Sequence, residues 1–82
     1  MLVHNYLVKE NGVTIESYYP NDHGNPVHLH VKGGGASTKI GPNGYPVKGQ
    51  PALSPKQAKV VEDNLPLIKK TIKEIQKWIK KT

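Results

Sequence analysis

The chain is 82 residues long, contains no cysteine and carries a net charge of +6, because its 12 basic residues, all lysine, outnumber six acidic ones. This length predicts a single small domain. The lack of cysteine excludes disulfides and thiolate metal sites, which suits a reducing compartment or a protein that unfolds during delivery. No segment approaches the roughly 20 apolar residues of a membrane helix, and the first residues lack a signal-peptide pattern, so no membrane partner is expected.

Lysine is concentrated in residues 54–82, which hold eight of the twelve. A basic surface suits polyanions, because each phosphate that it neutralises releases bound counterions. Without arginine, bidentate recognition of guanine is disfavoured, so contacts with nucleic acid would fall mainly on the backbone. The alternative is a solvated lysine face that only keeps the protein in solution.

Residues 2–8 contain strand-forming side chains and predict a first β-strand. Asn11-Gly12 predicts a two-residue hairpin turn of type I′, in which both central residues need a positive φ. Residues 13–19 are expected to return as the second strand. Because side chains alternate along a strand, one face would carry Val13, Ile15, Ser17 and Tyr19, and the other Thr14, Glu16 and Tyr18.

Residues 27–31 predict a third strand, which a run of three glycines ends, and residues 38–40 predict a short fourth strand. Asn43-Gly44 predicts a second tight turn. The chain would then return along a sheet edge, because Pro46 cannot donate to a strand ladder. The segment around the three glycines has the wrong order for a phosphate-binding P-loop. Its backbone amides can still cradle a phosphate beside Lys39, although a plain turn is the simpler interpretation.

Two helices are predicted in the C-terminal part. Ser54, Pro55 and Gln57 form the pattern of an N-cap, a first-turn proline and a capping box. Asn64 before Pro66 predicts a break, with Asn64 available to cap the second helix. An apolar stripe at three- and four-residue spacing then predicts an amphipathic helix that packs on the sheet through Leu65, Ile68, Ile72, Ile75 and Ile79.

Together these elements predict an α+β fold for a single domain, residues 1–82. Residues 1–49 would form a small antiparallel sheet of four or five strands. Residues 54–82 would form two C-terminal helices packed on one face of this sheet.

The third strand carries the most distinctive chemistry. Alternation places His28, His30 and Lys32 on the face opposite the apolar side chains of the same strand. His23, in the preceding loop, can fold over this face, and Tyr18 and Glu16 can join it from the neighbouring strand. Two imidazoles can serve as a general base and a general acid, deprotonating a 2′-hydroxyl of RNA and protonating the leaving 5′-oxygen.

We therefore predict His28, His30 and His23 as catalytic residues, with Lys32, Lys39, Tyr18 and Glu16 as substrate-binding residues. The lysines would stabilise the charge that develops on the phosphate. This chemistry needs no cofactor and no metal.

Two other interpretations of the histidines remain open. His-x-His offers two nitrogens to one metal ion, and His23 or Asp22 would supply a third ligand, so the alternative metal site is His23, His28 and His30. The other interpretation is that exposed strand histidines perform no chemistry. His4 stands alone on the first strand and is expected to be structural.

The segment Asn21-Asp22-His23, followed by a proline and by His28-Leu29-His30-Val31, resembles an uncharacterised bacterial domain family with the signature Asn-Asp-His, prolines and His-x-His. That family has a small β-sheet followed by helices and is similar to the toxin half of toxin–antitoxin pairs. The stretch 39–49 and the lysine-rich helix with Trp78 also resemble the C-terminal domains of polymorphic and contact-dependent toxins. The chain departs from the signature at Val27, where a proline is usual.

The resemblance implies a bacterial toxin domain with His23, His28 and His30 as its site. Such domains act in the cytoplasm, including that of a target cell after delivery within a larger secreted protein, and are neutralised by an immunity protein or antitoxin. With the chemistry above, the leading hypothesis is a metal-independent ribonuclease that acts on RNA, with tRNA as a candidate substrate. The alternative is a non-catalytic module of a toxin–antitoxin system that binds nucleic acid or protein.

Overall fold

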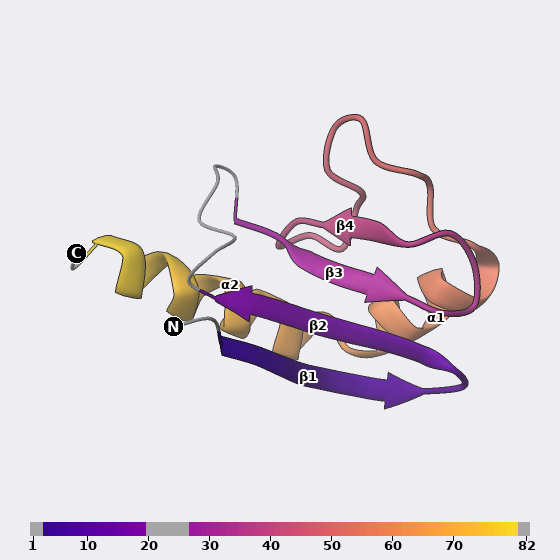
Figure 1. The fold of residues 1–82 in the computed structure, drawn as a ribbon, viewed down its shortest axis with the longest axis horizontal. Helices are drawn as coiled ribbons and strands as arrows, with labels where there is room; N and C mark the ends of the chain where they lie inside the picture. Colours follow the sequence, from indigo (N-terminus) through magenta and orange to yellow (C-terminus); the bar gives the residue numbers. More distant parts are fainter. Residues whose placement is uncertain (1–2, 20–26, 81–82) are drawn as a thin grey trace.

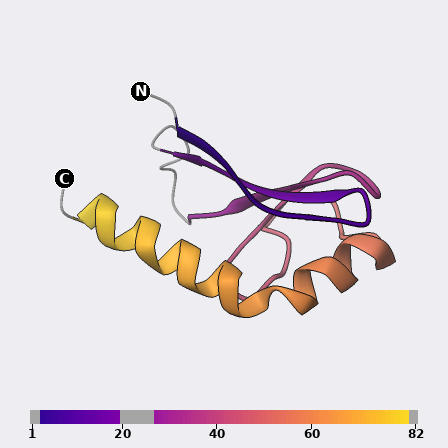
Figure 2. The same cartoon turned by 90° about the horizontal axis from the view of Figure 1, so that it is seen from below.

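The computed structural model describes residues 3–19 and 27–80, with side chains for residues 5–17 and 27–77. A four-stranded antiparallel sheet forms one layer and two helices form the other (Figures 1 and 2). The predicted fold class is confirmed. The strands lie in chain order, β1 (Val3–Glu10), β2 (Val13–Tyr19), β3 (Leu29–Lys32) and β4 (Thr38–Ile40), and are followed by α1 (Pro55–Asp63) and α2 (Leu65–Lys80).

The first hairpin has the predicted turn. Asn11 and Gly12 have φ values of 50° and 74°, as a type I′ turn requires. The strand β1 is longer than predicted, because it continues to Glu10 and pairs there with Val13. A bulge shifts the register between Tyr6 and Val8.

That bulge changes the face on which β1 places its side chains. Tyr6 lies opposite Glu16, on the face away from the helices, whereas Val8 lies opposite Ile15 and is buried. The alternation along β1 is therefore reset at Leu7, which packs partly against the core.

The core lies between the sheet and the helices. The predicted alternation holds on β2 and β3, where Val13, Ile15, Leu29 and Val31 are all fully buried. Burying a side chain of this size stabilises the fold by about 2 kcal/mol. The strand β3 begins at Leu29, two residues later than predicted. The helices and the last strand complete the core with Ile40, Val60, Val61, Ile68 and Ile72.

A turn after β4 folds back along the edge of the sheet. Gly44 has a φ of 82° in this turn, and its amide donates to the carbonyl of Gly41. The amide of Val47 donates to the carbonyl of Lys39 at 2.8 Å, while Pro46 forms a single bridge with Ile40. The returning chain therefore covers the β4 edge without adding a fifth strand.

The helix α1 begins as predicted. The hydroxyl of Ser54 accepts a hydrogen bond from the Gln57 amide at 3.1 Å, and the Gln57 side chain accepts one from the Ser54 amide at 2.9 Å. Gln57 is fully buried, and its Nε2 donates to the carbonyls of Gly33 and Ala36. Ser54 Oγ donates to the carbonyl of Gly34 at 2.7 Å. The glycine run is therefore the docking point of α1 on the sheet.

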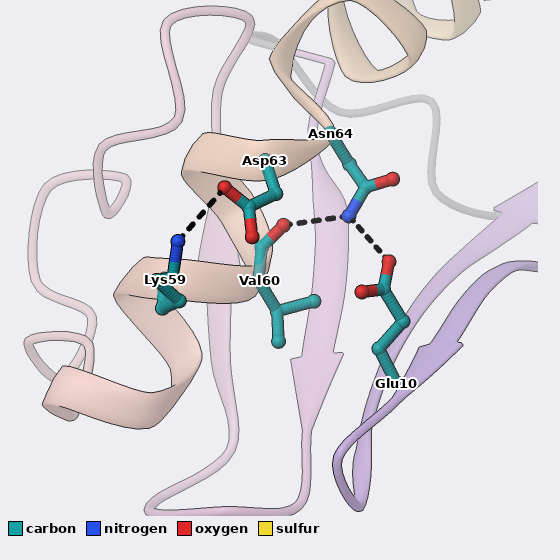
Figure 3. Close-up of polar contacts among 5 residues, drawn as sticks. All are labelled: Glu10, Lys59, Val60, Asp63 and Asn64. Carbon is teal, nitrogen blue, oxygen red and sulfur yellow. Dashed lines mark hydrogen bonds and ion pairs between the residues drawn. The ribbon is translucent and has the colours of Figure 1, made fainter.

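The two helices meet at Asn64, which is the C-cap of α1. Its carbonyl accepts the hydrogen bond from the Ile68 amide in α2. Its side-chain nitrogen donates to the Val60 carbonyl at 2.7 Å and to Glu10 at 2.9 Å (Figure 3). Asn64 thus joins the helix junction to the end of β1, a contact that the capping prediction did not include.

The stripe on α2 faces the sheet as predicted. Ile68 and Ile72 are buried, and Leu65 and Ile75 pack partly against the core. The side chain of Ile79 lies outside the described residues. In the described part of the chain, no helix combines the length and the apolar character needed to cross a bilayer.

Candidate functional site on the open face of the sheet

The face of the sheet turned away from the helices carries a row of polar side chains. In the strand register, Tyr6 of β1 lies opposite Glu16 of β2, Glu16 opposite His30 of β3, and His30 opposite Lys39 of β4. Directly opposed residues on one face have their Cβ atoms about 5 Å apart. The row therefore places a carboxylate and an ammonium group on either side of one imidazole.

His28 stands beside this row. Its ring centroid lies 5.3 Å from that of His30, and the two ring planes are inclined by 59°. Both residues are half-buried, and the Nε2 atom of His28 is itself buried. The prediction that these two histidines share one face is therefore confirmed, and their rings lie next to each other.

Glu16, which lies opposite His30, is the buried carboxylate of this cluster. The residue is only 4% exposed although it lies on the face away from the core. Its Oε2 accepts a hydrogen bond from the Thr14 hydroxyl at 2.7 Å, and its Oε1 lies 3.5 Å from Lys32 Nζ. Buried carboxylates are costly unless they are paired and hydrogen-bonded, and these two neighbours meet that requirement.

The predicted site residues are partly brought together. Lys32 pairs with Glu16, and Lys39 lies across from His30 on the last strand. Tyr18 lies in β2 opposite His4, but its side chain is outside the described residues. His23 and Asp22 also fall outside the described residues, so their placement relative to the histidine pair stays a prediction.

For the alternative metal site, the described residues supply only the histidine pair. Among the side chains that the structure describes, those of residues 5–17 and 27–77, no group of three histidine, aspartate or glutamate side chains is placed to hold a metal ion. Glu16 stands opposite His30 in the register but does not complete such a set. The third ligands predicted from the sequence, His23 and Asp22, lie outside the described residues.

Two neighbours of the cluster were not anticipated as site residues. Thr14 holds Glu16, and Tyr6 closes the far end of the row, with Lys9 Nζ 4.1 Å from the centre of its ring. Alternation along the second strand already placed Thr14 on the same face as Glu16, so this contact was within reach of sequence reasoning. Tyr6 was not, because only the bulge puts it opposite Glu16.

No protein-family model matches the sequence, and neither a curated protein nor a solved structure is detectably similar to it. The resemblance to toxin domains therefore stays a prediction, and function has to be argued from the geometry of the open face.

Proposed function

We propose that this chain is a small metal-independent ribonuclease that uses the open face of its sheet. The observation that carries the proposal is the pair of His28 and His30, whose ring centroids lie 5.3 Å apart. Beside this pair lie the carboxylate of Glu16, which is paired with Lys32, and a second lysine, Lys39. Acid, base and phosphate-binding groups are what cleavage of RNA through its own 2′-hydroxyl requires.

The reaction would be an internal transfer of the phosphodiester. One imidazole takes the proton of the 2′-hydroxyl while this oxygen attacks phosphorus. The second imidazole, initially protonated, gives its proton to the 5′-oxygen as the bond between phosphorus and that oxygen breaks. The products are a 2′,3′-cyclic phosphate and a 5′-hydroxyl, so no water and no metal enters the step.

The lysines would stabilise the phosphate as its charge increases in the transition state. Lys39 lies opposite His30, and the side chain of Lys32 is 44% exposed above its ion pair with Glu16. Glu16 would serve mainly to position Lys32 and the strand, because its own side chain is 5% exposed. His23 and Tyr18 would complete the site from the neighbouring loop and strand.

The biological setting that fits this activity is a bacterial toxin domain acting on RNA, with tRNA as a candidate, in the cytoplasm of its own or a target cell. The net charge of +6 supports a polyanionic substrate. An immunity protein or antitoxin would neutralise the domain, most simply by covering the histidine face with acidic side chains.

The test is cleavage of RNA in the presence of a metal chelator. The wild-type protein should produce 2′,3′-cyclic phosphate ends and should leave a 2′-O-methylated RNA intact. His28→Ala and His30→Ala should each lower the rate by about a hundredfold or more, the scale of one acid–base group. Asn5→Ala, an exposed position on β1 outside the cluster, is the control and should cleave normally.

Circular dichroism of each variant separates loss of chemistry from loss of fold. Full activity in both histidine variants would contradict the proposal. Activity that is lost on chelation and restored by zinc would favour the metal site instead.

The second candidate is a non-catalytic module that binds nucleic acid or protein through the same face. The pairing of Glu16 with Lys32 and Thr14 favours it, because such a cluster also stabilises adjacent strands without performing chemistry. This candidate predicts RNA binding with a steep dependence on salt and no cleavage by the wild-type protein.

A further inference from the structure

A hollow lies between α2 and the turn that follows β4. It has a volume of about 570 Å³ and is lined by Pro42 and Asn43 from the turn and by the buried Ile72 of α2. The rest of its wall consists of polar α2 side chains: Lys69, Lys70, Lys73 and Gln76. Figure 2 shows the chain after β4 descending from the sheet to the helix layer at this place. Three ammonium groups therefore share one hollow that none of the described carboxylates lines.

The three lysines are also not neutralised elsewhere. Among the described residues, none of Lys69, Lys70 and Lys73 forms an ion pair. Lys69 and Lys73 are four residues apart on the helix, a spacing at which like charges destabilise an isolated helix. The buried stripe of α2 does not require lysine at these positions, because they are exposed. This concentration of charge is suited to an anionic ligand that neutralises it.

An exposed aromatic ring lies next to this hollow. Pro42 and Asn43 also line a second, smaller hollow of about 250 Å³, together with Tyr45 and Lys48. Tyr45 is 74% exposed, although an aromatic side chain of this size usually buries most of its surface. The turn from residue 41 to residue 48 thus presents a ring and a lysine on one side and adjoins the α2 lysines on the other.

This surface continues into the histidine face. The amide of Val47 donates to the carbonyl of Lys39, so Lys48 follows directly along the outer edge of β4. Lys39 in turn lies opposite His30. Lysines therefore occur on the histidine face, at the β4 edge beside Tyr45 and in the hollow on α2, while Glu62 lines a further hollow on the α1 side of Tyr45.

We propose that the turn 41–48 and the lysine flank of α2 form an accessory site for single-stranded RNA, in which Tyr45 stacks on a base while Lys69 and Lys73 bind successive phosphates. Exposed aromatic rings beside a basic groove are the usual means of binding single strands without reading their sequence. The site goes beyond the proposed cleavage. It rests only on the assignment of RNA as the ligand, and it would hold the part of the strand that has passed the histidines.

The test measures binding of a fluorescent 2′-O-methyl oligouridylate, which lacks the hydroxyl that cleavage requires, to the whole chain at several salt concentrations. Lys69→Gln with Lys73→Gln should lower the slope of log affinity against log salt by about 1.4, at about 0.7 for each phosphate contact. The control is Lys56→Gln with Lys59→Gln, which removes the same formal charge from exposed positions on α1, where Lys59 pairs with Asp63, and should change the slope little.

The tyrosine is tested separately. Tyr45→Ala should weaken binding about fivefold or more, whereas Tyr45→Phe, which keeps the ring, should bind as the wild type does. An equal fall of the salt slope in the two double-lysine variants would show that only the net charge matters, and it would overturn the site. Binding unaffected by Tyr45→Ala, tighter binding of duplex RNA, or complete competition by poly-glutamate would each overturn single-stranded RNA as its ligand. Cleavage is assayed independently on unmodified RNA, so an inactive protein that still binds through this surface refutes only the ribonuclease.

Discussion

Gln57 is the side chain whose removal should reveal how the helices are attached to the sheet. It is fully buried, yet it lies at the third position of a helix whose first turn is otherwise exposed. Its amide group makes three hydrogen bonds, donating to the carbonyls of Gly33 and Ala36 and accepting from the amide of Ser54. The change Gln57→Ala removes all three and leaves the backbone of α1 intact.

The magnitude follows from those three bonds. Each contributes about 1 kcal/mol net, and a buried group left unpaired costs about 1–3 kcal/mol. Gly33 and Ala36 are exposed residues, so water can replace part of the hydrogen bonding that their carbonyls lose. The loss of stability should therefore lie near the sum of the three net hydrogen-bond contributions, without a large further penalty for unpaired groups. Alanine is the better helix former, which offsets a few tenths of a kcal/mol. We expect Gln57→Ala to lower the free energy of unfolding by about 3 kcal/mol.

Urea unfolding followed by circular dichroism measures this loss. A domain of this length typically has a stability of about 4–12 kcal/mol, so the midpoint should fall substantially while the slope against urea stays unchanged. Gln76→Ala, on the exposed side of α2, is the matched control and should change stability by less than about 0.5 kcal/mol. A loss below about 1 kcal/mol in Gln57→Ala would show that the glycine turn does not anchor α1.

Two further substitutions test the turns and the helix junction. Gly34→Ala should melt at a lower temperature than Gly49→Ala: both glycines have positive φ, but a Cβ at Gly34 would lie 2.8 Å from Val13 Cγ2, whereas nothing lies within 4 Å of one at Gly49. Asn64→Asp should destabilise by about 1–2 kcal/mol at neutral pH, because it replaces a donor to the Glu10 carboxylate at 2.9 Å with a second carboxylate. Equal melting temperatures of the two glycine variants, or an unchanged midpoint for Asn64→Asp in chemical denaturation, would contradict these contacts.

The parts of the fold that were predictable from the sequence are those in which few neighbouring residues decide the geometry. Asn11-Gly12 determines a turn because both residues tolerate positive φ. Ser54 and Gln57 determine the start of α1 because each side chain reaches the other's backbone. Alternation on β2 and β3 predicted which side chains enter the core, since one face of the sheet is covered.

The features that escaped prediction depend on contacts between distant segments. The bulge near Leu7 has no local signal, and it alone puts Tyr6 rather than Leu7 on the histidine face. The docking of Gln57 on the glycine run joins residues that are more than 20 positions apart. From the sequence, this run was interpreted as a turn or as a binding loop for phosphate. The sequence does not show that side chains at a helix N-terminus will donate to its carbonyls.

The burial of each side chain decides how a mutation at the candidate site has to be interpreted. His28 and His30 are half-buried side chains on the face away from the core, so their removal leaves the packed layer of Leu29 and Val31 intact. Loss of cleavage in those variants can therefore be assigned to chemistry. Glu16 differs, because it is 4% exposed and holds two neighbours. Replacing it would remove the ion pair between Glu16 and Lys32 and disturb the hydrogen bond from Thr14. A fall in activity in Glu16→Gln is therefore evidence of a catalytic or positioning role only to the extent that the variant keeps the unfolding midpoint of the wild type.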